Sequence, residues 1–137
     1  MAEFTHFKKD GSAVMVDVHE KPDTYRAASA TGTIQVSPEV FAAVRDHTAK
    51  KGDVLGVARL AGIMGAKKNA ELIPLCHIVP LTNCEVTFTT DENTNSITAV
   101  CTTSCVGKTG VEMEALTGVP QRCSRSTICA RRWTAAW

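Results

Sequence analysis

Two carboxylates stand two residues apart late in the chain, immediately after a turn that contains glycine. They are Glu112 and Glu114, which follow Gly110. Acidic residues are favoured in the first turn of a helix, because they face the positive end of the helix dipole. Side chains two residues apart on a helix diverge by about 200°. We therefore expect one carboxylate to point into a site and the other towards a partner chain.

A second compact motif, residues 72–77 (LIPLCH), places a cysteine and a histidine side by side in a loop stiffened by proline. His77 could transfer protons near neutral pH, although a lone histidine is also often structural. Metal binding is another interpretation, with Cys76, His77 and Glu112 or Glu114 as ligands. The short ligand spacing of common zinc sites is missing, so the sequence favours no metal and no cofactor.

Three basic residues could bind an anionic ligand. Lys51 stands between two expected helices, where a lysine strengthens the anion site of a helix N-terminus. The alternative for Lys51 is an ordinary cation at the C-terminus of the preceding helix. Arg26 lies among small residues of an expected strand and needs a carboxylate or phosphate partner if it is buried. Lys67, at the end of a glycine-rich helix, is either solvated or in contact with a phosphate.

The elements that must position these residues follow from periodicity and capping signals. Ser37 and Pro38 are typical of a helix start, Gly52 is suited to a left-handed helix end, and Asp53 can cap the next helix. Small residues throughout that second helix indicate close approach of another backbone, within the domain or across a subunit interface. The expected strands are 14–18, 25–36, 83–89 and 96–105, and the expected helices are 38–52, 54–68 and one that begins near 111. This order predicts an α+β domain with an antiparallel sheet and helices on one face.

Composition excludes several classes of protein. The net charge of +1 does not favour a nucleic-acid partner. No apolar run of 18 residues and no signal peptide are present, so we expect no membrane partner and a cytoplasmic location. The six cysteines include no C-x-x-C pair, which indicates reduced thiols rather than a disulfide framework.

Taken together, six segments resemble the cyclic pyranopterin monophosphate synthase family of molybdenum cofactor biosynthesis. The resemblance covers the chain from about residue 5 to residue 119. The matching segments are MVDV at 15–18, TYRA at 24–27, KGDVL at 51–55, ARLAGI at 58–63, LIPLCH at 72–77 and TGVEMEALT at 109–117.

The resemblance implies a ferredoxin-like α+β fold and a hexamer of dimers with sites between subunits. It implies conversion of 3′,8-cyclo-7,8-dihydroguanosine 5′-triphosphate, a cyclised GTP derivative, to cyclic pyranopterin monophosphate and pyrophosphate. Lys51 is implied as a catalytic residue. The implied substrate-binding residues are Leu75, Cys76, His77, Glu112, Met113, Glu114, Arg26 and Lys67.

The resemblance ends at Val119. The family has a catalytic aspartate and a catalytic lysine where this chain has Ile128 and Arg131. Reading the codons one base out of frame permits Asp at 128 and Lys at 131. We therefore interpret residues 1–119 as one domain and residues 120–137 as a frameshifted tail in place of the family's catalytic helix and last strand. The alternative function is an inactive relative that retains only substrate or subunit binding.

Overall fold

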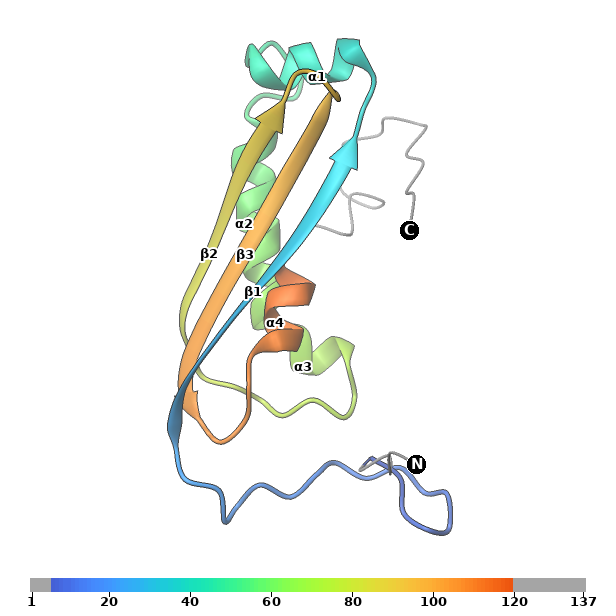
Figure 1. The fold of residues 1–137 in the computed structure, drawn as a ribbon, viewed down its shortest axis with the longest axis vertical. Coiled ribbons are helices and arrows are strands. Elements are labelled where there is room, and N and C mark those ends of the chain that lie inside the picture. The colour runs from blue at the N-terminus through green and yellow to red at the C-terminus, as the bar shows by residue number, and fades with distance from the viewer. Residues whose placement is uncertain (1–5, 120–137) are drawn as a thin grey trace.

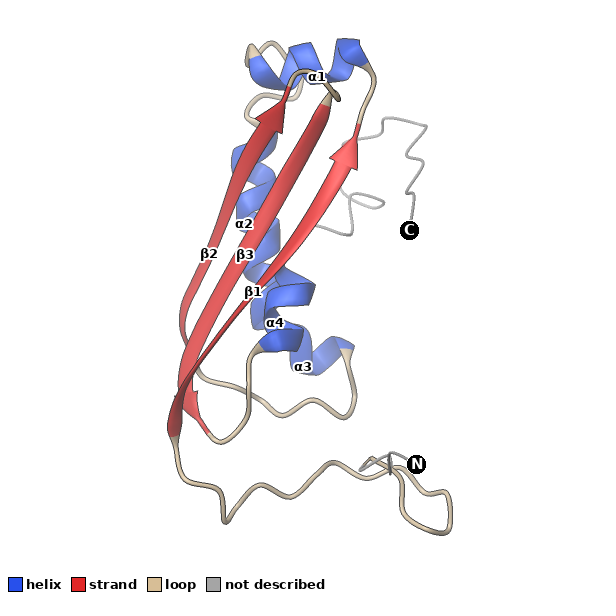
Figure 2. Cartoon of the chain, in the orientation of Figure 1, coloured by secondary structure: helices blue, strands red, loops and turns tan. Residues whose placement is uncertain are grey.

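Three long strands form one antiparallel sheet, and helices cover one of its faces (Figure 1, Figure 2). The structure is a computed structural model that describes residues 6–119. The strands are β1 (Thr24–Gln35), β2 (Leu81–Asp91) and β3 (Ser96–Gly107), in the order β1-β3-β2. The helices are α1 (Pro38–Arg45), α2 (Val54–Lys67), α3 (Asn69–Leu72) and α4 (Glu112–Gly118). The predicted α+β class is confirmed.

The capping signals act as predicted, although the first helix is shorter than expected. Ser37 accepts a hydrogen bond from the backbone of Val40, and Asp53 accepts one from Gly56. Helix α1 ends at Arg45 because no large apolar residue follows Val44 to keep its core-facing side buried. The backbone is left-handed first at His47, with φ of 54°, and only later at the predicted Gly52, with φ of 84°.

The strand predicted at 14–18 is wrong. These residues form no ladder, and the only β-bridge among residues 6–23 joins Phe7 and Ala13. Their alternating apolar pattern arises because Val14, Val16 and Val18 are half-buried while the residues between them are exposed. Alternate burial can therefore occur in an extended segment that packs by its side chains and leaves its backbone unpaired with a strand. The other three predicted strands are confirmed, with ends shifted by up to two residues.

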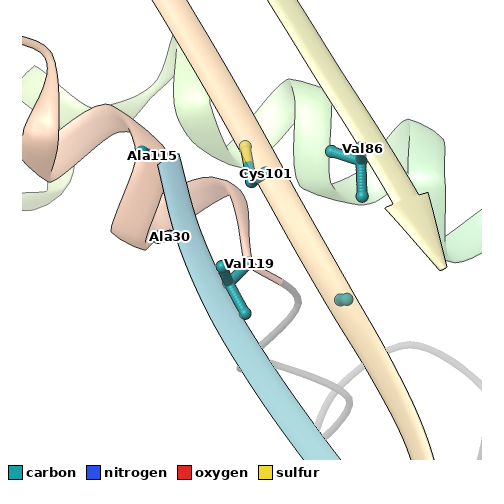
Figure 3. Packing of buried hydrophobic residues seen from close by; sticks show 6 residues of the cluster. Ala30, Val86, Cys101, Ala115 and Val119 are labelled. Atoms are coloured by element: carbon teal, nitrogen blue, oxygen red, sulfur yellow. The ribbon is translucent and has the colours of Figure 1, made fainter. Parts of the chain in front are cut away.

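The core lies between the sheet and the pair α2 and α4, and it is built mainly from small side chains. Ala30, Ala99, Cys101 and Ala115 are buried there with larger residues such as Val86 (Figure 3). A second cluster, centred on Phe41, Val44 and Ile97, packs α1 against the other end of the sheet. The small side chains allow α4 to lie close to the strands.

Helices α2 and α4 approach each other backbone to backbone. A methyl group on Gly62 would lie 2.5 Å from the carbonyl oxygen of Gly118, and one on Gly65 would lie 2.8 Å from that of Thr117. Both distances are too short for a real contact, so these two positions of α2 require glycine. The close approach predicted from the small residues is confirmed, and it occurs within the chain.

We predict that Gly62→Ala destabilises the fold by about 1–3 kcal/mol, the usual cost of overpacking a core. Alanine is a better helix former than glycine, so helix propensity alone would raise the free energy of unfolding. A lower value would therefore come from the clash with Gly118. Urea unfolding followed by circular dichroism measures the change. Ala61→Ser is the control, because it also adds one heavy atom but at an exposed position of the same helix. Equal stability of Gly62→Ala and the parent would contradict the packing.

Candidate functional site

Most of the predicted site residues gather at one end of the sheet. The segment before β1, the loop between α3 and β2, and the connection from β3 to α4 all meet there (Figure 1). Arg26 lies near the start of β1, His77 in the loop, and Glu112 and Glu114 in the first turn of α4. The fold therefore joins motifs that are far apart in the sequence.

The two carboxylates of α4 have different environments, as their spacing predicted. Glu112 is exposed, whereas Glu114 is only 5% exposed. Glu114 accepts a hydrogen bond of 2.9 Å through Oε1 from the side-chain amide of Asn69. Asn69 is itself 1% exposed, and its Oδ1 accepts a bond of 2.7 Å from the Thr117 hydroxyl. A buried carboxylate is thus held by a buried amide.

Arg26 and the two carboxylates share one electrostatic environment around Cys105. Arg26 pairs with Cys105 across β1 and β3. The pKa of the Cys105 thiol is raised first by burial and next by the charge of Glu114, while Arg26 lowers it and Glu112 adds a small rise. Nε of Arg26 is buried and has no hydrogen-bond partner among the described residues. A buried donor without an acceptor is costly, so an anionic ligand at this position would be favoured.

His77 is oriented by the segment that precedes β1. Its Nε2 lies 2.7 Å from the backbone oxygen of Val16. A carbonyl oxygen can only accept, so Nε2 carries the proton and donates it to this bond. Nδ1 is then the nitrogen that can accept a proton from a ligand. The same segment is held by Lys108, whose ammonium donates to the backbone oxygen of His19.

Lys51 is the predicted site residue that the fold does not bring to this end. It lies between α1 and α2, at the opposite end of the sheet (Figure 1). Helix α2, which is about 21 Å long at 1.5 Å per residue, runs from this connection to Lys67. One copy of the chain therefore cannot place Lys51 beside His77 and Glu114.

The remaining predicted residues lie around the rim of the site. Leu75 and Cys76 are half-buried in the loop, and Met113 is 40% exposed beside Glu112. Lys67 is exposed on the side of β2, where its charge acts on Cys84. Burial is the main influence on that thiol and raises its pKa. Lys67 therefore approaches from the edge of the sheet opposite to Arg26.

An open depression of about 480 Å³ lies elsewhere, between α2 and the edge of β2. Arg59, Ile63, Cys84 and Val86 are among the residues that line it, and the predicted site residues are not. Arg59 donates a hydrogen bond of 3.0 Å to the backbone oxygen of Val86 and lies over the ring of Phe88. Arg59 thus protects the backbone of an edge strand.

Sequence reasoning missed Asn69 and Thr117. Thr117 ends the segment TGVEMEALT without a role assigned to it, and Asn69 adjoins a lysine pair typical of a solvated helix end. Asn69 is buried only because α4, more than 40 residues later, packs over it. No local signal could have identified this contact.

Other expectations concern thiols, metals and membranes. Cys76, Cys84, Cys101 and Cys105 are free thiols, as predicted. Within residues 6–119, no three His, Cys, Asp or Glu side chains are grouped so as to hold a metal ion. No helix in this part of the chain is long and apolar enough to cross a bilayer. Ile128, Arg131 and the interpretation of 120–137 as a frameshifted tail lie outside the described residues.

Comparison with known proteins identifies the family. Residues 15–125 match the MoaC family, which is most of the chain. This chain belongs to the MoaC family. A relative from Cereibacter sphaeroides (strain ATCC 17029) is 53% identical over 123 residues, or 90% of this chain and 77% of its own length. One from Thermomicrobium roseum is 54% identical over 119 residues, 87% of this chain and 72% of its own length.

A further relative, from Clostridium botulinum (strain Alaska E43), is 52% identical over 117 residues, covering 85% of this chain and 74% of its own length. All three relatives are named cyclic pyranopterin monophosphate synthase. The MoaC match extends six residues beyond Val119, where the sequence resemblance was expected to end. The matched range includes Arg26, His77 and Glu114, which the fold brings to one end of the sheet.

The buried thiols of this MoaC protein make its stability fall as the pH becomes alkaline. Burial, with smaller contributions from the neighbouring Cys84, raises the pKa of Cys101 to about 12. An unfolded cysteine loses its proton near pH 8.5–9. The unfolded chain therefore binds fewer protons above that pH, and stability falls as pH rises from about 9 towards 12.

We predict that the free energy of unfolding decreases over this range by up to about 1.4 kcal/mol per pH unit for each such thiol. Urea unfolding under reducing conditions at pH 8, 9.5 and 10.5 measures it. Cys101→Ala lowers stability at every pH but should have the shallower slope, which separates this thiol from Tyr25 and the lysines. Parallel slopes for the two proteins would contradict the assignment.

Proposed function

We propose that this protein is a cyclic pyranopterin monophosphate synthase in molybdenum cofactor biosynthesis. Its substrate is then the cyclised GTP derivative, which is converted with release of pyrophosphate. The observation that carries the proposal is 53% identity over 90% of the chain to a synthase of that name, together with the gathering of four of the six matching motifs, at 15–18, 24–27, 72–77 and 109–117, at one end of the sheet. The substrate is a small soluble metabolite, so a cytoplasmic location fits the proposed reaction.

The chemistry of the gathered residues suits this substrate. A triphosphate needs cations, and Arg26 offers a buried Nε without an acceptor while Lys67 adds charge at the rim. Rearranging a purine-derived ring needs groups that give and take protons. We assign this work to His77 through Nδ1 and to the carboxylates of Glu112 and Glu114. Leu75, Cys76 and Met113 supply the walls of the pocket.

Lys51 completes the site from a neighbouring copy of the chain. This assignment is supported by its position at the far end of α2, out of reach of His77 in the same copy. It also agrees with the exposed apolar side chains Val57, Leu60 and Met64, which are spaced to form a stripe along α2 suited to a subunit contact. A hexamer of dimers is the assembly that we expect.

The alternative function is binding without turnover. It is favoured by Ile128 and Arg131, which stand where the resemblance places an aspartate and a lysine. Ile128 has no proton to transfer, and arginine stays protonated where a lysine can titrate. The two alternatives share the binding residues described above and differ only in the catalytic step.

We predict that His77→Ala and Lys51→Ala each weaken binding of the cyclised nucleotide by at least about tenfold, the value of one charge-assisted contact. Calorimetric titration measures affinity, and circular dichroism confirms that the variants are folded. Lys50→Ala is the matched control, because it removes an exposed cation next to Lys51. Unchanged affinity in both variants would refute this pocket.

Mixing the two variants tests whether the site is shared. If Lys51 and His77 come from different copies, oligomers formed by refolding His77→Ala with Lys51→Ala contain some sites with both residues intact. A fraction of high-affinity binding should then return. No recovery in an oligomer shown to contain both variants would place Lys51 outside the site.

A further prediction concerns turnover. The chain as written should form little or no product, since loss of a positioned acid–base group costs about 10²–10⁴-fold. The comparison is with a version that carries the alternate reading frame after Val119, extended to the length of its relatives. Pyrophosphate release from purified cyclised nucleotide is measured for both proteins side by side. Equal rates would show that Ile128 and Arg131 do not occupy catalytic positions.

A further inference from the structure

Asn69 connects the loop of His77 to the helix of Glu114. It is the first residue of α3, the short helix that directly precedes the loop. Its backbone oxygen accepts a hydrogen bond from the backbone N–H of Ile73 at the end of this helix. Its side chain contacts α4 at two positions one turn apart, Glu114 and Thr117. A single buried amide therefore joins two of the motifs that form the proposed site.

The hydrogen bonds give this amide a defined direction. The hydroxyl of Thr117 donates to Oδ1 of Asn69, and Nδ2 of Asn69 donates to Oε1 of Glu114. The reverse orientation would place Oδ1 against the carboxylate and leave the Thr117 hydroxyl facing an NH2 group. A carboxylate has only acceptors to offer, so its ionised form favours the observed orientation. The Thr117 hydroxyl can donate or accept, so it anchors Oδ1 of Asn69 in the orientation that the carboxylate selects.

Of the two carboxylates of α4, the one held in this way has the larger effect on the Cys105 thiol. Arg26 on β1, Cys105 on β3 and Glu112 on α4 share its electrostatic environment. No second hydrogen bond to this carboxylate forms among residues 6–119. Asn69 is therefore the group that sets where the carboxylate lies between α4 and the sheet.

We propose that Asn69 is a positioning residue of the synthase, which orients the Glu114 carboxylate towards the cyclised nucleotide and is itself anchored by Thr117. This inference rests on the proposed function. Asn69 acts through Glu114, so its loss should weaken substrate binding even in a protein that remains folded.

Asn69→Asp tests the proposal, because it keeps the size of the side chain and an acceptor for Thr117 but replaces the donor with an oxygen. We expect the Kd for the cyclised nucleotide to rise about tenfold, equivalent to about 1.4 kcal/mol. Asn83→Asp is the control for charge, since it makes the same substitution at an exposed position of β2. A Kd within twofold of the parent in Asn69→Asp would overturn the proposal.

The double variant N69D/E114Q separates positioning from stability. It exchanges the two groups, so that an amide at 114 donates to a carboxylate at 69. Thermal stability should recover from that of Asn69→Asp, while the Kd stays weak because the carboxylate no longer lies on α4. Recovery of both stability and affinity would show that binding does not need a carboxylate on Glu114, which overturns the proposal.

Crystal structures of the free parent and Asn69→Asp proteins distinguish this inference from the proposed function. If the parent does not bind the cyclised nucleotide, the proposed function fails. The position of the Glu114 side chain in the two structures then still tests whether Asn69 positions it. A changed position of its carboxyl group in Asn69→Asp supports the positioning role. An unchanged position overturns that role, whatever the ligand.

Discussion

The close contact between α2 and α4 is the constraint on which the rest of this structure depends. Gly62 and Gly65 let the backbone of α4 approach α2 at Gly118 and Thr117. On its other side α4 lies against small residues of the sheet, including Ala30 and Cys101 (Figure 3). A short helix held on both sides by backbone and small side chains has little freedom to tilt or slide, because close-packed interiors transmit displacement.

That contact also explains why the proposed site has its form. With α4 fixed, its first turn lies over α3, so Glu114 is buried against Asn69 while Glu112 remains exposed. The loop after α3 brings His77 to the same end of the sheet, and the segment before β1 fixes its tautomer through Val16. The packing of glycine residues in α2 therefore determines the placement of polar groups that are distant in sequence.

The length of α2 has a further consequence for assembly. The helix runs along the sheet from the end near α1 towards α3, so Lys51 just before it and Lys67 at its end belong to different regions of one copy. A motif conveys which residues act together but not whether they come from one chain. Lys51 is expected in one pocket with His77 and Glu114 but lies far from them in one copy. Its position therefore supports the proposal of a site shared between copies.

The sequence by itself determined the local features: the caps at Ser37 and Asp53, the three long strands, the glycine-rich helix and the divergence of Glu112 from Glu114. Each leaves a local pattern in the sequence: a capping residue, alternating side chains or helical spacing. Only the tertiary structure decided that 14–18 is an unpaired segment, that α1 ends at Arg45, that Asn69 is buried and that Lys51 lies apart. These features depend on contacts between distant segments, and burial by a distant element leaves no mark on the residues nearby in the sequence.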